Sequence, residues 1–434
     1  MNAYENVKIC VASRELTSFE EEFRSFSRIR VHECTARSIA QYSEGRLREK
    51  APNLTGLYQF VSAIKTRSRG VYLWVQIVVD LLITEYRDGN FEDEMWKKFD
   101  ALPRKLGGKD GLYMHMMRRI RTDYLDEFKR LVQLSLSSPD EWSPLSFDII
   151  TLFLAAQGHL KSTNNPALQV KSDDYQLKTW NEWQPRREHL EKRLKSRCNG
   201  LLEGTDPVQF IHQTAKQFFL RKYLWDQIFR KDLGFTCEIE IQLAAMSGLV
   251  RRLKCCREAV VIYEIGSPIA DNDPWRGAEV PQRSRSLFTD IFNLACSLDS
   301  SCSKDIHKRS YIGLLDELDE IGEDLTRELR TSRSESSISW PDIYWRRRES
   351  LDFWNEQDLY LGNMTFLDCA MLHGLCTYTE EKFRDRTPSE FQLANALFRA
   401  TRRQNLELRK IAANWIGARY STLEPSPTTV QLLF

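Results

Sequence analysis

Glycine and proline are scarce in this sequence, with 19 and 14 residues among 434. Because tight turns depend on these two residues, their scarcity argues against an all-β protein with many turns. The chain also has no surplus of either charge, since 62 lysines and arginines face 61 aspartates and glutamates. A dedicated nucleic-acid binder carries a basic surplus or a basic stripe, so this balance argues against that class.

No two of the ten cysteines form a Cys-x-x-Cys pair, and no set of cysteines and histidines has the tight spacing of a zinc site. The first ten residues lack the basic start and the apolar core of a signal peptide. The longest apolar run, residues 70–83, contains Asp80 and is shorter than the ~20 residues that cross a bilayer. We therefore expect a cytoplasmic protein with reduced cysteines, no membrane span and no metal ligands.

A P-loop of the form G-x-x-x-x-G-K-[ST] is missing as well. The nearest segment is LGGKDG at residues 106–111, where Asp110 stands in place of the serine or threonine and Pro103 in place of the first glycine. We interpret this segment as a loop. The sequence therefore predicts no nucleotide hydrolysis and no catalytic residue in this chain.

Helical patterns dominate what is present, and the chain is long enough for roughly three domains of ~150 residues. Apolar residues recur at helical spacing in residues 57–64, 71–86, 91–102 and 112–120. The helix over residues 71–86 is apolar on nearly all sides, so we expect it to be buried between other helices.

Helices followed by a β-hairpin are predicted between residues 121 and 228. One helix should begin at Ser143-Pro144, and a later one should end at Asn199-Gly200. Two short strands then flank a turn at residues 204–207, and the second strand leads into another helix. This order of elements is that of a winged-helix domain.

The N-terminal segment predicts two short strands, at residues 7–13 and 28–34. Thr35 follows at the N-cap position of a helix through Ile39 and Tyr42. A buried parallel strand needs neighbours on both sides, and no earlier residues of this sequence supply them. We expect exposed strand edges here that make the isolated chain prone to aggregation.

Residues 229–434 predict further helices with long polar insertions. Residues 240–250 and 365–378 share a loose Leu-x-x-Ala-x-x-x-Gly-Leu pattern, which suggests degenerate ankyrin-like helix pairs, although two copies do not establish an array. Residues 313–324 predict an amphipathic helix whose acidic residues line its solvated side. These residues are Asp316, Glu317, Asp319 and Glu320.

A basic run surrounds the adjacent cysteines Cys255 and Cys256 and contains Arg251, Arg252 and Lys254. It could lower the pKa of a thiol, or it could be the basic face of a helix with two packed thiols. We favour the second interpretation.

Five segments carry motifs in a consistent order. They are VKICVASRE (7–15), RVHECTARSIAQYS (30–43), GVYLWVQIVVDLL (70–82), ALPRKL to LYMHMMRRI (101–120), and RCNGLLE with VQFIHQTAKQFFL (197–220). Together they resemble the fungal NACHT-type signalling NTPases, the STAND class related to animal NLR proteins. In that resemblance they are the sensor-1 strand, the following helix start, a Gly-Val-Phe-Leu-Trp-Val helix, a Leu-Pro to Leu-Tyr connection, and the Ile/Leu-His-x-Thr end of the winged-helix domain.

The resemblance implies a mainly α fold in four parts. Residues 1–45 would be an α/β remnant of the NTPase core, and residues 46–120 a helical domain. Residues 121–228 would be a winged-helix domain, and residues 229–434 a helical C-terminal region, with degenerate ankyrin-like repeats as one option.

Two residues match nucleotide contacts of the family. Arg14 matches the sensor-1 arginine, and His212 matches the winged-helix histidine that reaches the phosphates. Both roles require a P-loop from residues outside this sequence, and ATP or ADP and magnesium would belong only to such a full-length parent. The alternatives are that Arg14 binds loop carbonyls at a strand end and that His212 is a core imidazole behind Phe210. Ser38 also stands where the family prefers aspartate.

The first hypothesis for function is the non-catalytic regulatory portion of a NACHT/STAND-type NTPase in fungal NLR-like signalling, the self/non-self recognition known as heterokaryon incompatibility. The second is a stand-alone helical scaffold for protein interaction without a nucleotide role. A third is a winged-helix nucleic-acid binder, against which the charge balance argues. We expect protein partners for the C-terminal helical region, no nucleic acid, and leave oligomerisation open.

Overall fold

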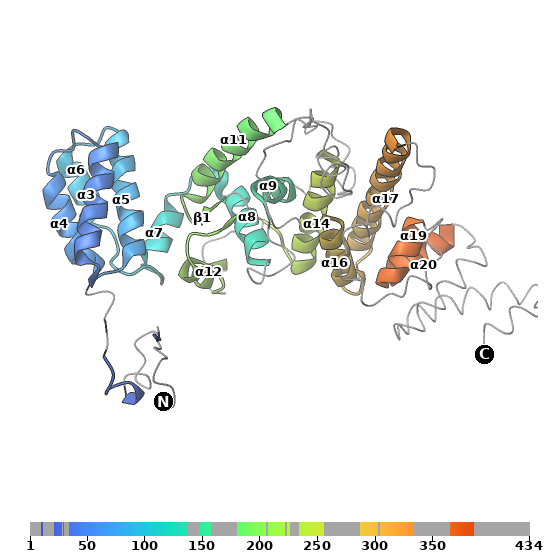
Figure 1. The fold of residues 1–434 in the computed structure, drawn as a ribbon, viewed down its shortest axis with the longest axis horizontal. Coiled ribbons are helices and arrows are strands. Elements are labelled where there is room, and N and C mark those ends of the chain that lie inside the picture. The colour runs from blue at the N-terminus through green and yellow to red at the C-terminus, as the bar shows by residue number, and fades with distance from the viewer. Residues whose placement is uncertain are drawn as a thin grey trace, which may run out of the picture. The chain divides into compact units, whose positions relative to one another are not determined.

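The computed structural model describes residues 10–11, 21–27, 29, 34–137, 147–157, 180–204, 207–221, 224–225, 234–255, 287–302, 304–333 and 365–385 (Figure 1). These residues contain fourteen α-helices, one 3-10 helix and a two-stranded antiparallel sheet, so the prediction of a mainly α fold is confirmed. The chain divides into two compact units, Met1–His115 and Met116–Phe434. No helix in the described ranges is both long and apolar enough to cross a membrane.

The first unit is built around a buried helix. Its helices are α3 (Ala36–Lys50), α4 (Leu57–Ser68), α5 (Tyr72–Arg87), α6 (Glu92–Asp100) and the start of α7 (Leu112–Arg118). Helix α5 contacts α3, α4 and α6. Its buried apolar side chains are Trp74, Val75, Ile77, Val78, Val79, Leu81, Leu82 and Ile83. The expectation of a buried helix over residues 71–86 is thus confirmed.

The C-terminal end of α6 is held by side chains from α4 and α5. The guanidinium of Arg67 donates to the carbonyl oxygens of Phe99, Asp100 and Leu102 at 3.0, 3.2 and 2.8 Å. The indole N–H of Trp74 donates to the carbonyl oxygen of Pro103 at 2.7 Å. Carbonyl groups at a helix C-terminus carry partial negative charge, so a cation there is favourable. The loop predicted at residues 106–111 follows.

The start of α3 differs in one detail from the prediction. Thr35 precedes the helix, as expected, but its hydroxyl donates to the carbonyl oxygen of Gly70 at 3.3 Å instead of capping α3. Most of the predicted strands at residues 7–13 and 28–34 lies outside the described residues. Within them, Val11 and Ile29 have no regular structure and are 64% and 81% exposed.

In the described part of the second unit, a 3-10 helix and three α-helices precede a hairpin. The order is η1 (Thr122–Tyr124), α8 (Leu125–Ser137), α9 (Ile149–Ala156), α11 (Trp180–Cys198), β1 (Leu202–Glu203), β2 (Gln209–Phe210) and α12 (Gln213–Phe219). The strands are antiparallel, with Leu202 opposite Phe210. Helix α11 ends at Asn199 and Gly200, both of which have positive φ, as predicted.

The start of α9 was predicted wrongly. The helix begins after Asp148 and not at Ser143-Pro144, which lies outside the described residues. The carboxylate of Asp148 accepts hydrogen bonds from the backbone N–H groups of Ile150 and Thr151 at 2.9 and 3.1 Å. An aspartate at this position satisfies N–H groups that the helix itself leaves unpaired.

Helix α14 (Glu238–Cys255) is central to the rest of the second unit. It contacts α9, α16 (Leu287–Asp299) and α17 (Asp305–Arg333) (Figure 1). Gly248 allows α14 to approach α9 closely, because an added Cβ would lie 2.7 Å from the Cβ of Ala155 and 2.9 Å from the carbonyl oxygen of Thr151. Real Cβ atoms do not come so close to their neighbours, so this crossing requires a glycine.

The two segments with the shared Gly-Leu pattern have different structures. Residues 240–250 are part of the continuous helix α14, which passes through Gly248. Residues 365–378 form α19 (Phe366–His373) and the start of α20 (Cys376–Asp385), joined at Gly374, which has φ 74°. Only the second segment is thus a pair of helices joined at glycine.

The acidic helix predicted at residues 313–324 is part of α17, but its acidic residues are not all solvated. Glu317 is 4% exposed, and its carboxylate lies 2.8 Å from the Nζ of Lys254 on α14. Asp316 pairs with Lys382 of α20 at 2.8 Å. These acidic side chains therefore join α17 to neighbouring helices.

Asp299, the last residue of α16, connects three helices. Its carboxylate accepts from the backbone N–H of Thr377, at the start of α20, at 3.1 Å, and from the hydroxyl of Tyr311, on α17, at 3.0 Å. The Thr377 hydroxyl donates to the Asp299 carbonyl oxygen at 2.9 Å. A residue 78 positions earlier in the sequence thereby caps α20.

Candidate functional site

His212 lies between β2 and α12 and is the N-cap of that helix. Its Nδ1 accepts a hydrogen bond from the backbone N–H of Thr214 at 3.1 Å and lies 2.9 Å from the Thr214 hydroxyl oxygen. The side chain is exposed, so the alternative of a core imidazole behind Phe210 is wrong. The His-x-Thr motif therefore has a local role as a helix cap, and a contact with nucleotide stays a prediction.

Arg14, the other predicted nucleotide contact, lies outside the described residues. The structure therefore does not place it relative to His212.

A cluster of charges joins α8 to α11 beside the hairpin. The carboxylate of Glu127 accepts two hydrogen bonds from Arg193, at 2.8 and 3.0 Å, and one from Arg197, at 2.8 Å. The guanidinium carbon of Arg197 lies 3.5 Å from the centre of the Tyr124 ring. Bidentate arginine–carboxylate pairs and arginines stacked on aromatic rings restrict the orientation of the side chains that form them. This cluster therefore holds α8 and α11 together beside the hairpin.

The basic run near Cys255 also serves internal contacts. Arg251 is 7% exposed and donates to the carbonyl oxygen of Leu154 at 2.8 Å, near the C-terminal end of α9. Arg252 pairs with Asp148, at the N-terminal end of the same helix, at 3.4 Å. Consecutive arginines of α14 thus bind opposite ends of α9. The helix of the favoured interpretation is present as α14, and two of its basic residues bind α9.

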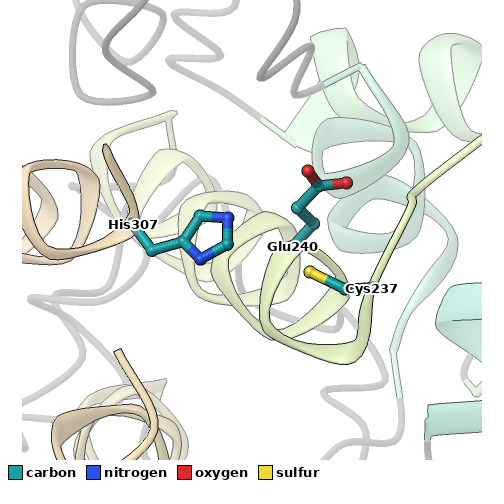
Figure 2. Close-up of side chains that lie close together, drawn as sticks. All are labelled: Cys237, Glu240 and His307. Atoms are coloured by element: carbon teal, nitrogen blue, oxygen red, sulfur yellow. The ribbon is translucent and has the colours of Figure 1, made fainter. Parts of the chain in front are cut away.

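Three possible metal ligands from two helices lie together in the second unit (Figure 2). Cys237 immediately precedes α14, Glu240 lies in its first turn, and His307 lies in the first turn of α17. The sulfur of Cys237, a carboxylate oxygen of Glu240 and a ring nitrogen of His307 all lie within 4.8 Å of one another. Ligands of one tetrahedral zinc ion are roughly 3.5 Å apart, given bond lengths of about 2.0–2.3 Å. Small side-chain rotations would therefore bring all three to one ion.

Burial of His307 and a hydrogen bond to Glu240 constrain these two side chains of the cluster. His307 is 6% exposed, and its Nδ1 is buried without a hydrogen-bond partner. The Oε2 of Glu240 accepts from the backbone N–H of Thr236 at 2.7 Å, which orients the carboxylate. A buried polar atom without a partner is unfavourable, so the nitrogen of His307 marks a position where a ligand would stabilise the fold.

A further thiol lies in the turn before α17. Cys302 is buried in the turn between α16 and α17, a few residues before His307. Burial, and then the nearby charges of Asp299 and Cys237, raise the pKa of the Cys302 thiol to about 11.

Sequence reasoning missed this cluster, although a weak signal was present. Cys237 and Glu240 have the spacing Cys-x-x-Glu, which places two side chains on one face of a helix turn. The expectation of no metal ligands rested on the tight spacing of cysteines and histidines alone and so left out the carboxylate of Glu240. Nothing in the sequence shows that two segments so far apart meet.

Comparisons of the chain with protein-family models, with curated proteins and with solved structures found no match.

Proposed function

We propose that this chain is the non-catalytic regulatory and interaction portion of a NACHT/STAND-type signalling NTPase of the kind that fungi use in self/non-self recognition. In such a protein the nucleotide would bind to a P-loop module outside this sequence. The chain would contribute a winged-helix arm that responds to the nucleotide, followed by a helical region that binds protein partners in the cytoplasm.

The observation that carries this proposal is the segment from β1 to α12. Helices α8, α9 and α11 precede an antiparallel strand pair, and a helix capped by His212 follows directly. The aromatic residues Phe218 and Phe219 of that helix are buried. This is the order expected for the end of a winged-helix domain with its Ile/Leu-His-x-Thr motif.

The capping geometry also favours a phosphate contact at His212. Because Nδ1 accepts the Thr214 backbone N–H, the proton of the neutral imidazole resides on Nε2. The ring is exposed, so Nε2–H is available as a donor to an external acceptor. A nucleotide phosphate is such an acceptor, and binding it would link the nucleotide state to the position of this arm.

The first experiment is to determine the mass and the N-terminal peptides of the endogenous protein, together with the 5′ end of its transcript. A product that is longer and carries G-x-x-x-x-G-K-[ST] supports the proposal. A product near 50.9 kDa that starts at Met1 contradicts it and favours the stand-alone scaffold.

The second experiment measures ADP release from the longer protein. His212→Asn keeps an N-cap acceptor but lacks Nε2–H, whereas His212→Ala loses both functions. Faster ADP release in both variants supports a phosphate contact. Unchanged release in His212→Asn would leave His212 with the capping role alone.

A further inference from the structure

We propose that Cys237, Glu240 and His307 bind one zinc ion, which joins the start of α14 to the start of α17. This inference does not depend on the proposed function. It assigns to the second unit a structural metal centre in addition to its hydrophobic core.

The donor set selects the metal. Thiolate, imidazole and carboxylate together are the ligands of zinc, which prefers four of them in tetrahedral arrangement. Calcium and magnesium bind oxygen ligands almost exclusively, so a site with sulfur and nitrogen excludes them.

The positions of three ligands support one common ion. The sulfur of Cys237, an oxygen of Glu240 and a nitrogen of His307 lie within 4.8 Å of one another, and the imidazole faces the other two side chains (Figure 2). Coordination through Nδ1 of His307 would give this buried nitrogen the partner that it lacks. No other described group of three histidine, cysteine, aspartate or glutamate side chains meets so closely.

A hydrogen bond orients one of the ligands. The backbone N–H of Thr236 holds one oxygen of Glu240, as ligands of metals are commonly held by a second hydrogen bond, and leaves the other oxygen for the metal. With three protein ligands, a water molecule would complete the tetrahedron.

A metal here would complement the contact at the other end of α14. There, Lys254 pairs with Glu317 of α17 at 2.8 Å. The zinc ion would connect α14 to α17 at the N-terminal end of α14, and the ion pair connects the same two helices near its C-terminal end. Since the ligands of zinc must assemble from separate helices, its binding would favour the folded state of this unit.

The test uses the full chain, expressed with zinc and purified under reducing conditions. Elemental analysis by mass spectrometry should find about one zinc per chain. After removal of zinc with a chelator, titration with Co²⁺ should give a thiolate-to-cobalt absorption band and the visible bands of tetrahedral cobalt. Absence of bound zinc together with absence of the thiolate band would overturn the proposal.

Three variants assign the ligands. Cys237→Ser, Glu240→Gln and His307→Gln should each weaken Co²⁺ affinity by about tenfold or more, and Cys237→Ser should remove the thiolate band. Two control variants at exposed positions, Cys34→Ser and His189→Gln, should leave both quantities unchanged. Equal affinity in these variants and the controls would contradict the site.

Circular dichroism of each variant without metal separates lost ligands from lost structure. Glu240 and Cys237 are half-buried at the start of a helix, so these two variants should keep the helical signal of the metal-free wild type. If His307→Gln unfolds because its site is buried, Glu240→Gln and Cys237→Ser still decide the outcome.

Discussion

Lys254 on α14 and Glu317 on α17 form an ion pair in which the lysine is partly exposed and the glutamate is almost completely buried. The Nζ–Oε1 distance is 2.8 Å, and the side chains are 35% and 4% exposed. Without Lys254, the buried carboxylate would have lost its hydration without gaining an ion pair, which is unfavourable. The pair therefore makes the packing of α14 against α17 dependent on one lysine.

Lys254→Met should destabilise the α14–α17 contact by about 2 kcal/mol, less than for a fully buried pair because the lysine is partly exposed. Hydrogen exchange of peptides from both helices measures the loss locally. Arg327→Met is the matched control on α17, since Arg327 pairs with Asp324 but is 71% exposed. It should change stability by about 0.5 kcal/mol or less. Equal effects of the two substitutions would contradict the role of the buried pair.

Replacing two helical glycines by alanine should have opposite effects. Gly248→Ala should destabilise the α9–α14 crossing by about 1–3 kcal/mol, because the new methyl group would overlap Ala155. Gly45→Ala, on the exposed side of α3 with nothing within 4 Å, should stabilise its helix by about 1 kcal/mol. Exchange rates of amides in α14 and α3 measure these changes. A stabilising effect at Gly248 would show that the two helices are not so close.

Low pH should weaken the contact between α9 and α14. Burial alone would raise the pKa of Asp148, but the charge of Arg252 and the hydrogen bonds from Thr151 and Ile150 outweigh it and lower the pKa below 3.8. The folded state therefore binds this proton less readily than the unfolded state. The stability contributed by Asp148 is present above about pH 4 and is lost as the pH falls through the lowered pKa.

Asp148→Asn tests this pH dependence. Asparagine keeps the helix cap but removes the charge that faces Arg252, so stability near pH 7 should fall by about 1 kcal/mol. The difference between wild type and variant in α9 amide protection should shrink between pH 6 and pH 3. A difference that stays constant over this range would contradict the linkage.

The cap at His212 gives a prediction about stability that is independent of any nucleotide. His212→Ala should destabilise α12 by about 0.5–2 kcal/mol, because the Thr214 N–H loses its acceptor. His212→Asn should largely restore the helix. Amide exchange at the start of α12 distinguishes the two variants, and equal protection in both would mean that the cap contributes nothing.

The helices were the most predictable part of this fold. Residues 71–86 are apolar on nearly all sides, and such a segment can only be stable when other helices surround it, as α3, α4 and α6 do. The end of α11 was predictable because Asn199-Gly200 readily adopts positive φ, and the hairpin was predictable from the turn that follows.

Three of the errors concern side chains whose partners are distant in sequence. Glu317 has the helical position of a solvated residue, and only Lys254, on another helix, makes its burial possible. Thr35 has the type and position of a cap, but its backbone is helical, with φ −80° and ψ −11°, and its hydroxyl donates to the distant carbonyl of Gly70. The cluster of Cys237, Glu240 and His307 was missed for the same reason, since α14 and α17 meet only in the folded chain.

The cap that Asp299 provides for α20 has a consequence for the order of assembly. The segment from Thr365 to Asp385 contains a capping box of its own for α19, formed by Thr365 and Asp368, but α20 borrows its cap from α16. A short helix without a cap is marginal in water. Helix α20 should therefore form only after α16 and α17 have met, and it should be among the first elements of this unit to open again.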